Sequence, residues 1–388
     1  MVHVMKFGGT SVVTGEALAQ VGRIVKRWLV GERPLVVVVS ALGTRPIKVT
    51  DWLLRGLQAA AVGELAQAAE AKAYLEAVHL DLITNVFGET AEQAELAEQI
   101  TIGLKAYDRL CEAVAVRGQI SATIEAECLS LGERWSAPIV AAYLRTQGIK
   151  AEAVMGTELV VTSEDVLAAT PDKALTRERV AARLGPLLAE GVVPVVTGFI
   201  GETVRGEVAL LGRGGSDYSA AILGEALAAT EVCIWTDVPG VMTADPRRVA
   251  VAQPIQSLSF GEVTTLALAG AKVLHPETMR PCWQANIPLR IKDTFAPERT
   301  GTLIVNDVAD DRRWRAVTSY RGGAEQAVVT LVGAGQGKEA AAVAAAWQTL
   351  SEAGVTVLAQ EARTDTVQAV VPVWDEDRAL WAWHDLVV

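Results

Sequence analysis

The sequence predicts an α/β protein, a three-layer sandwich with a mostly parallel sheet, followed by a small ferredoxin-like α+β module at the C-terminus. Short β-branched runs alternate with helical patterns along most of the chain. Near-continuous apolar strands such as Leu35–Val39 are typical of a sheet that is covered on both faces. A polar, turn-rich passage at residues 306–313 then precedes a shorter tail, so we expect two domains, residues 1–305 and 314–388.

The strands of the larger domain are expected where apolar runs end in glycine-containing turns. The first covers Val2–Phe7, and the others cover Leu35–Ser40, Val192–Thr197 and Glu231–Thr236. Between about residues 51 and 117 the strand pattern disappears and leucines recur at helical spacing. This part is predicted to be a helical excursion from the sheet.

The tail is predicted to alternate strands and helices in the manner of a ferredoxin-like module. The tail has some 70 residues, which is room for one such module. The expected elements are a strand at Ala327–Val332, a helix at Lys338–Ala353, strands at Val355–Ala359 and Val367–Val373, and a helix at Asp375–Leu386.

Composition excludes several classes of function. The 388 residues include 51% hydrophobic ones and carry a net charge of −11, which argues against a nucleic-acid or anionic-membrane partner. No apolar run approaches the ~20 residues of a spanning helix, and no leader pattern precedes the first strand. The four cysteines lack Cys-x-x-Cys spacing, so we expect no protein metal site and a cytoplasmic location.

The first chemical motif is Lys6–Ser11, which reads Lys-Phe-Gly-Gly-Thr-Ser and follows the first strand. Glycines allow the backbone to approach phosphate oxygens, and Lys6 supplies a positive charge. The motif is neither a P-loop nor a dinucleotide-binding fingerprint. An ordinary turn is the alternative interpretation.

The second motif, Leu211–Ala221, is a glycine-rich loop that leads into an alanine-rich helix. Arg213 offers a bidentate fork for a carboxylate, and Ser216 and the loop amides suit an anion at a helix start. In the alternative, Asp217 caps the helix and Arg213 is a solvated charge. Three glycines around one arginine favour the functional interpretation.

Two further segments have weaker signals. Ile234–Arg247 begins at a strand end and continues through a turn-rich loop, the position at which open parallel sheets bind ligands. Its alternative is a Pro-Gly turn with an Asp-Pro break. Gly270–Pro276 places Lys272 among apolar residues, where a lone lysine usually reaches to solvent.

Together, these segments make the chain resemble the aspartate kinases of the amino-acid kinase family. Lys6–Val12 matches the opening motif of that family, and the other three segments match later motifs in the same order. Val39–Ala41, Leu131–Ser136 and Thr197–Gly201 are further matches, and the resemblance covers about residues 1–305.

The resemblance implies a reaction and its site residues. ATP would transfer its γ-phosphoryl group to the side-chain carboxylate of L-aspartate, the first step towards lysine, threonine and methionine, with Mg²⁺ held largely by phosphate oxygens and water. Lys6 and Asp217 would be catalytic. The implied substrate-binding residues are Ser40, Thr50, Glu133, Phe199, Arg213 and Ser216, and the implied nucleotide-binding residues are Gly8, Gly9, Thr236, Asp237, Met242, Arg247, Lys272 and Val273.

Glu133 and Arg213 also fit the substrate on physical grounds. An α-amino acid presents one cation and one anion, so its site needs one partner of each sign: Glu133 for the ammonium group and Arg213 for a carboxylate. Taken alone, Glu133 reads as a carboxylate in the first turn of a helix.

The chain departs from the family pattern in several places. The loop 42–49 is longer than usual, Met242 replaces a frequent tyrosine, and residues 208–210 replace threonines. The tail has room for one ACT module where the family usually has two, which implies reduced feedback control by lysine or threonine. A single module with uncovered sheet edges favours a homodimer.

Two other hypotheses remain. The altered loop 42–49 and the reduced tail are compatible with a kinase of the same fold that phosphorylates another carboxylate in a specialised pathway. A non-catalytic amino-acid sensor that uses the tail is the third hypothesis, and the presence of Lys6, Glu133, Arg213 and Asp217 argues against it.

Overall fold

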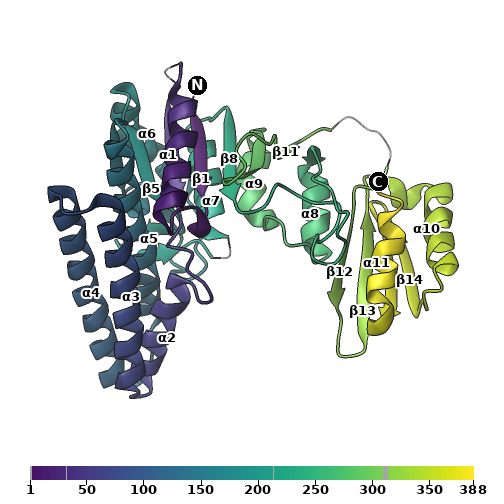
Figure 1. Cartoon of the computed structure of the whole chain (residues 1–388), viewed down its shortest axis with the longest axis horizontal. Coiled ribbons are helices and arrows are strands. Elements are labelled where there is room, and N and C mark those ends of the chain that lie inside the picture. Colours follow the sequence, from purple (N-terminus) through teal and green to yellow (C-terminus); the bar gives the residue numbers. More distant parts are fainter. Residues whose placement is uncertain (1, 32, 213, 309–312) are drawn as a thin grey trace. The chain divides into compact units, whose positions relative to one another are not determined.

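The computed structural model describes residues 2–31, 33–212, 214–308 and 313–388 (Figure 1). Internal contacts divide the chain into two compact units. The first unit comprises residues 1–237, 280–287 and 293–297, and the second comprises residues 238–279, 288–292 and 298–388. Helix α9 (Pro276–Gln284) and strand β10 (Leu289–Asp293) each contain residues of both units.

A parallel sheet is the framework of the first unit. Its strand order is β3-β5-β2-β1-β8, and each neighbouring pair is parallel. The bounds are β1 His3–Phe7, β2 Leu35–Val39, β3 Ala151–Val154, β5 Val193–Thr197 and β8 Glu231–Thr236. The four strands expected from the sequence are confirmed, because their β-branched residues are buried as a sheet covered on both faces requires.

Helices cover both faces of this sheet. Met5 and Phe7 belong to the core that includes residues of α1 (Gly15–Leu29) and α5 (Ala122–Thr146). Successive side chains of a strand point to opposite faces, so Lys6 points to the other face, where α7 (Gly215–Ala226) packs on β1 and on α6 (Lys173–Ala189). The three-layer α/β sandwich is therefore confirmed.

The predicted helical excursion is also confirmed. It consists of α2 (Val49–Ala61), α3 (Leu65–Phe87) and α4 (Ala91–Arg117), which lie side by side in Figure 1. Their apolar residues, including Leu57, Leu75 and Leu104, are buried in the same core as α5. Among the residues described by the structure, no helix has the length and apolar character needed to cross a bilayer.

A small sheet supports the loop that leads into α7. It joins β4 (Val161–Thr162), β6 (Ile200–Thr203) and β7 (Val208–Leu210), with β6 between the other two. Residues 211–217 follow β7 directly, so this sheet fixes where the glycine-rich loop begins.

The second unit contains an antiparallel sheet with strand order β12-β13-β15-β14. The predicted strand at Val355–Ala359 is wrong: the strand β14 begins at Ala359, and the strand β12 was not expected. The bounds are β9 Ser257–Ser259, α8 Phe260–Leu268, β11 Thr302–Val305, β12 Ala316–Arg321, β13 Gln326–Val332, α10 Ala340–Glu352, β14 Ala359–Arg363, β15 Thr366–Pro372 and α11 Glu376–His384.

The core of the second unit extends beyond the tail. Ala244 and Val249, which lie on the segment after β8, are buried in one cluster with Val317, Leu331 and Trp383. The division of the sequence into residues 1–305 and 314–388 stays a prediction, whereas contacts group residues 238–279 with the tail.

Candidate active site

A cavity of about 1330 Å³ lies in the first unit at the carboxyl ends of β1, β2 and β8. This is the edge at which parallel α/β sheets bind ligands. The cavity brings together site residues that are far apart in the sequence. The predicted residues that line it are Lys6, Gly8, Gly9, Ser40, Thr50, Glu133, Phe199, Ser216, Asp217, Thr236 and Asp237.

The glycine turn after β1 is in direct backbone contact with the loop after β2. The Gly8 N–H donates to the Trp235 carbonyl oxygen over 3.0 Å. A Cβ on Gly9 would lie 2.6 Å from the Ala41 carbonyl oxygen, and one on Gly43 would lie 2.5 Å from the Gly9 carbonyl carbon. Only glycine fits at these positions, so the backbone itself forms this wall of the cavity.

A long-range hydrogen bond supports the same turn. The hydroxyl groups of Ser11 and Thr294 lie 2.7 Å apart and are buried, although the two residues are separated by 283 positions. The Thr294 N–H donates to the Thr236 carbonyl oxygen over 2.8 Å. The ends of β1 and β8, where Lys6 and Thr236 line the cavity, are thereby held together.

Lys6 and Asp217 form an ion pair inside the cavity. The Lys6 Nζ lies 2.7 Å from Asp217 Oδ1, and the two side chains are only 10% and 20% exposed. Asp217 lies in the first turn of α7, whose N-cap is Gly214, so the alternative role of Asp217 as the cap does not hold. The pair instead presents an ammonium group beside the glycine turn.

The loop before α7 is held in a conformation that glycine favours. Gly212 and Gly214 have φ angles of 73° and 67°, in the left-handed region. A Cβ on Gly215 would collide with the ring of Phe199, whose N–H donates to the Ser219 hydroxyl over 2.8 Å. Arg213, the predicted carboxylate clamp, lies outside the described residues.

Glu133 is the most distinctive titratable group of the cavity. It lies in the middle of α5, not in a first turn, and is 3% exposed. Its Oε1 accepts from the Ala41 N–H over 3.0 Å, while its Oε2 is buried without a hydrogen-bond partner. Burial raises the pKa of the Glu133 carboxyl to about 8, although the Ala41 N–H and the Lys6 charge act in the opposite direction.

The approach of α5 to the cavity depends on a small residue. A Cβ on Gly132 would lie 2.7 Å from the Cβ of Ala41. The Ser136 hydroxyl donates to the Ser40 carbonyl oxygen over 2.7 Å and so fixes the loop after β2 against the same helix. Gly132 and Ser136 of the Leu-Gly-Glu-Arg-Trp-Ser motif therefore hold the helix that carries Glu133 against the loop after β2.

Sequence reasoning did not identify Arg45 or the Ala41 N–H as part of the site. Arg45 lines the cavity, and its Nη2 lies 3.2 Å from Asp237 Oδ2. Two cations, Arg45 and Lys48, in an unusually long loop were the available signal. Thr50, whose assignment depended on that loop, does line the cavity, at the start of α2.

The remaining predicted nucleotide residues belong to the second unit. Arg247 is paired with Asp245: its Nε donates to Asp245 Oδ1 over 2.9 Å. Met242 is half-buried and forms an isolated β-bridge with Pro254, Lys272 is exposed, and Val273 is half-buried.

In the described part of the chain, no group of three or more His, Cys, Asp or Glu side chains has the geometry of a metal site.

Comparison with known proteins defines the class of protein. Residues 1–293 match the model of the Amino acid kinase family. The chain belongs to this family, and its parallel sheet, glycine turn and Lys6–Asp217 pair are what the family resemblance leads one to expect.

Individual relatives of the chain within this family are aspartokinases. The chain is 35% identical over 330 residues to the lysine-sensitive aspartokinase 3 of Escherichia coli strain K12, covering 84% of this chain and 69% of that protein. It is 36% identical over 304 residues to the chloroplastic aspartokinase 3 of Arabidopsis thaliana, covering 78% of this chain and 52% of that protein. The chain thus spans about half the length of the Arabidopsis relatives that it matches.

A solved structure supports the same conclusion. The crystal structure of E. coli aspartokinase III in complex with aspartate and ADP, in its R-state, has a TM-score of 0.73 and 30% sequence identity to this chain. The similarity covers 96% of this chain and 79% of that one.

Proposed function

We propose that this chain is an ATP-dependent aspartate kinase, which transfers the γ-phosphoryl group of ATP to the side-chain carboxylate of L-aspartate and releases 4-phospho-L-aspartate and ADP. The observation that carries the proposal is that the Lys6–Asp217 ion pair and Glu133 line the same cavity, and that one carboxylate oxygen of the buried Glu133 has no hydrogen-bond partner. The E. coli relative crystallised with aspartate and ADP supports the same pair of ligands.

The chemistry matches what the cavity provides. A carboxylate oxygen of aspartate attacks the γ-phosphorus, a new P–O bond forms, and the bond to the bridging oxygen of ADP breaks. The attacking carboxylate is already ionised at pH 7, so the step needs no general base. Lys6 neutralises the charge on the transferring group, and Asp217 orients the Lys6 ammonium through their 2.7 Å contact.

Glu133 is proposed to receive the ammonium group of aspartate. Its unpaired Oε2 is buried and lacks a hydrogen-bond donor, which an ammonium group would supply. By resemblance, Arg213 would bind a carboxylate of the substrate, and the polar and aromatic walls around it would include Ser40, Thr50, Phe199 and Ser216. The opposite charges of Glu133 and Arg213 would fix the orientation of the amino acid.

The nucleotide is proposed to bind with its phosphates at Gly8 and Gly9. Gly8, Gly9 and Lys6 line the same cavity, so phosphate oxygens that enter it can reach both the glycine backbone and the Lys6 ammonium group. Thr236 and Asp237 line the same cavity, and Met242, Arg247, Lys272 and Val273 are assigned to the nucleotide by resemblance alone.

Magnesium fits the donors of this cavity as a companion of the nucleotide. Among the described residues, the cavity has carboxylates such as Asp217 and Asp237, but no group of three His, Cys, Asp or Glu side chains that could hold a metal ion by itself. Mg²⁺ commonly binds through phosphate oxygens, water and one or two carboxylates. When bound, it would lower the negative charge that the attacking carboxylate meets.

The physiological role is proposed from the reaction. 4-Phospho-L-aspartate would lead to lysine, threonine and methionine in the cytoplasm, and reduced feedback control by lysine or threonine is a prediction that the assay below tests. We also propose a homodimer, because β14 is an exposed edge strand of the tail sheet and Leu358 beside it is 51% exposed. Light scattering of the full chain would test the dimer.

A hydroxylamine assay tests the function. The protein is incubated with Mg-ATP and either L-aspartate, L-glutamate or related acids, and the acyl phosphate is trapped as a hydroxamate while ADP is measured. We expect hydroxamate from aspartate and little from glutamate, with no loss when lysine or threonine is added. Hydroxamate from neither acid, with no ADP release, would contradict the proposal.

A kinase that acts on another carboxylate is the second candidate. The loop 42–49, which the sequence comparison with the family pattern predicts to be longer than usual, contributes Arg45 and Lys48 to the wall of the cavity. ADP release with a related acid and not with aspartate would favour this candidate.

A further inference from the structure

The segment 241–255 of the second unit is packed into the C-terminal module. It carries Met242 and Arg247, for which the family resemblance predicts nucleotide contacts. The Val317 N–H, on β12, donates to the Thr243 carbonyl oxygen over 2.8 Å. Ala244 and Val249 are 4% and 0% exposed and share the apolar core of the module with Trp383.

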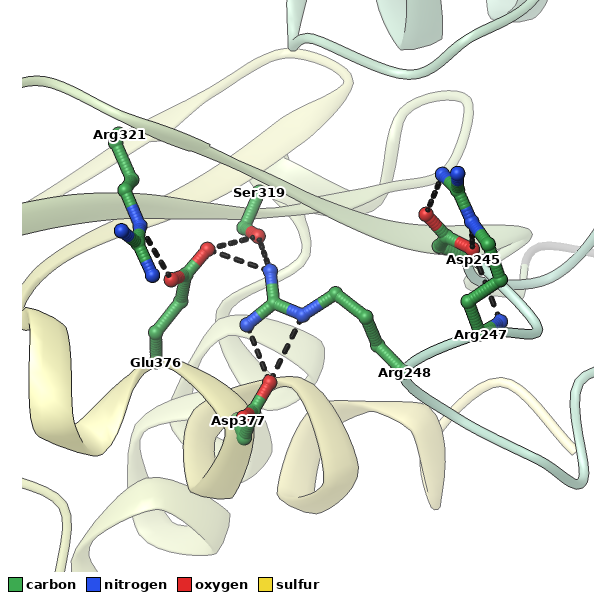
Figure 2. A network of polar contacts seen from close by, with 7 residues as sticks. All are labelled: Asp245, Arg247, Arg248, Ser319, Arg321, Glu376 and Asp377. Carbon is green, nitrogen blue, oxygen red and sulfur yellow. Dashed lines mark hydrogen bonds and ion pairs between the residues drawn. The ribbon is translucent and has the colours of Figure 1, made fainter. Parts of the chain in front are cut away.

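A cluster of polar side chains adds a second attachment, which Figure 2 shows. Arg248 Nη1 donates to Glu376 Oε1 over 2.5 Å and to the Ser319 hydroxyl over 2.6 Å, and its Nε donates to Asp377 Oδ1 over 2.8 Å. Arg321 Nε lies 3.6 Å from the other Glu376 oxygen. The side chain of Glu376 is 5% exposed, so its charge depends on these partners.

Adjacent arginines of the segment have different partners. Figure 2 shows Arg247 with Asp245, apart from the Glu376 cluster that holds Arg248. Arg247 is 68% exposed, whereas Arg248 is 28% exposed. The backbone carbonyl of Arg248 also accepts from Trp381 Nε1 over 3.1 Å, so both the side chain and the backbone of Arg248 are attached to the module.

A buried hydrogen bond attaches the beginning of the segment. Thr243 Oγ1 lies 2.9 Å from His384 Nε2, and the two residues are 7% and 0% exposed. The Gln253 N–H donates to the same hydroxyl over 2.9 Å, which joins the two ends of the segment. Met242 therefore directly precedes a residue that is fixed by α11.

We propose that the C-terminal module holds segment 241–255 in its nucleotide-binding conformation, with Arg248 as the positioning residue. Arg248 acts through its neighbour Arg247 and does not itself contact the nucleotide. The inference rests on the proposed function for its effect on ATP, whereas the attachment itself follows from contacts within the second unit. The module would then be required for nucleotide binding whether or not any amino acid regulates the enzyme.

Steady-state kinetics of the full-length Arg248→Ala and Arg248→Lys variants test the proposal. For Arg248→Ala we expect the KM for Mg-ATP to rise about tenfold. The KM for aspartate should change less than about twofold, because the residues that are proposed to bind the substrate aspartate lie in the first unit. Arg248→Lys retains a cation for Glu376 and should restore most of the affinity for Mg-ATP. Equal increases in both KM values, or no increase in either, would overturn the proposal.

Arg363→Ala is the matched control. Arg363 pairs with Glu361 on β14 over 2.8 Å, in the same module but without a contact to segment 241–255. Both KM values should stay at the wild-type level. A rise in the KM for Mg-ATP equal to that of Arg248→Ala would mean that any disturbance of the module has the same effect, which would also overturn the proposal.

Hydrogen exchange separates this inference from the proposed function. In the absence of any ligand, the amides of residues 241–255 should exchange faster in Arg248→Ala and in Glu376→Gln than in the wild type, while those of β13 should not. Unchanged exchange of the segment would overturn the attachment even if the enzyme is an aspartate kinase. A wild-type protein that binds no Mg-ATP would refute the proposed function and the nucleotide part of this inference, and exchange would still test the attachment.

Discussion

Glu133 in the cavity and Glu376 in the second unit are equally buried but differ in their partners. They are 3% and 4% exposed. Glu133 has one backbone donor and an unpaired oxygen, and burial raises its pKa to about 8. Burial acts on the pKa of Glu376 in the same direction, but the hydrogen bonds of Arg248 and Ser319 and the charge of Arg321 outweigh it, so that pKa is lowered.

The difference supports the proposal that one buried carboxyl, Glu376, is structural and that the other, Glu133, is functional. Glu376 has cations for partners within the chain and is therefore part of a completed network. Glu133 lines the cavity and has a buried, unsatisfied oxygen, and such a group is costly to maintain unless a ligand completes it. Burial alone would not have separated the two roles.

The largest expected effect concerns the cation of the cavity. Lys6→Ala removes the charge that is proposed to stabilise the transferring phosphoryl group, so kcat should fall by about 10³-fold or more. The hydroxamate assay measures this. Lys26→Ala, which changes an exposed lysine of α1, should retain wild-type kcat. Undiminished turnover of Lys6→Ala would exclude the proposed role of Lys6.

Glu133→Gln should weaken the binding of aspartate and raise the free energy of unfolding at pH 7. The KM for aspartate should rise about 100-fold, because a neutral amide replaces the proposed partner of the ammonium group. The folded state retains the Glu133 proton between the unfolded pKa of 4.5 and the folded pKa of about 8, so wild-type stability falls as pH rises through this range. At pH 7 the variant should gain on the order of 3 kcal/mol in unfolding free energy, measured with urea.

Glu376→Gln should have the opposite effect on stability. Removing the charge leaves Arg248 without its buried anion, and we expect a loss of about 2 kcal/mol at pH 7. Because the pKa of Glu376 is lowered in the fold, its contribution is present above pH 4.5 and is lost as pH falls through the folded value. The difference between variant and wild type should therefore shrink in acid. A loss that persists unchanged at pH 3 would contradict the charge-based explanation.

The smallest expected effect concerns an exposed pair. Arg45 lies 3.2 Å from Asp237, but its side chain is 80% exposed, so water screens the interaction. Arg45→Ala should change the unfolding free energy by less than about 1 kcal/mol in thermal or urea denaturation. A larger loss would show that exposure is a poor guide to the value of an ion pair in this protein.

Elements with a strong local pattern were predicted from the sequence. The apolar run Leu35–Val39 and the leucine-rich helices α2 and α4 carry their signal in their own residues. The edge strand β14 does not: Ala359–Arg363 is polar and exposed, as edge strands often are, and the prediction placed the strand in the preceding apolar residues.

That Lys6, Glu133 and Asp217 line one cavity was predictable from motifs, whereas the tertiary contacts of the cavity were not. Lys6, Glu133 and Asp217 follow from motifs. The unpaired oxygen of Glu133 depends on how α5 packs against the loop after β2, and the partners of Arg248 lie 128 and 129 residues further along the chain. No local pattern contains such contacts.

Proton release on aspartate binding tests most directly whether Glu133 receives the ammonium group. Calorimetry of the wild type at pH 7, in two buffers of different ionisation enthalpy, counts the protons that leave when aspartate binds. The carboxyl is mostly protonated before binding and must ionise to pair with the ammonium group, so we expect about one proton per aspartate at pH 7 and little release at pH 9. Glu133→Gln should release none, and aspartate binding to the wild type at pH 7 without proton release would contradict the assignment.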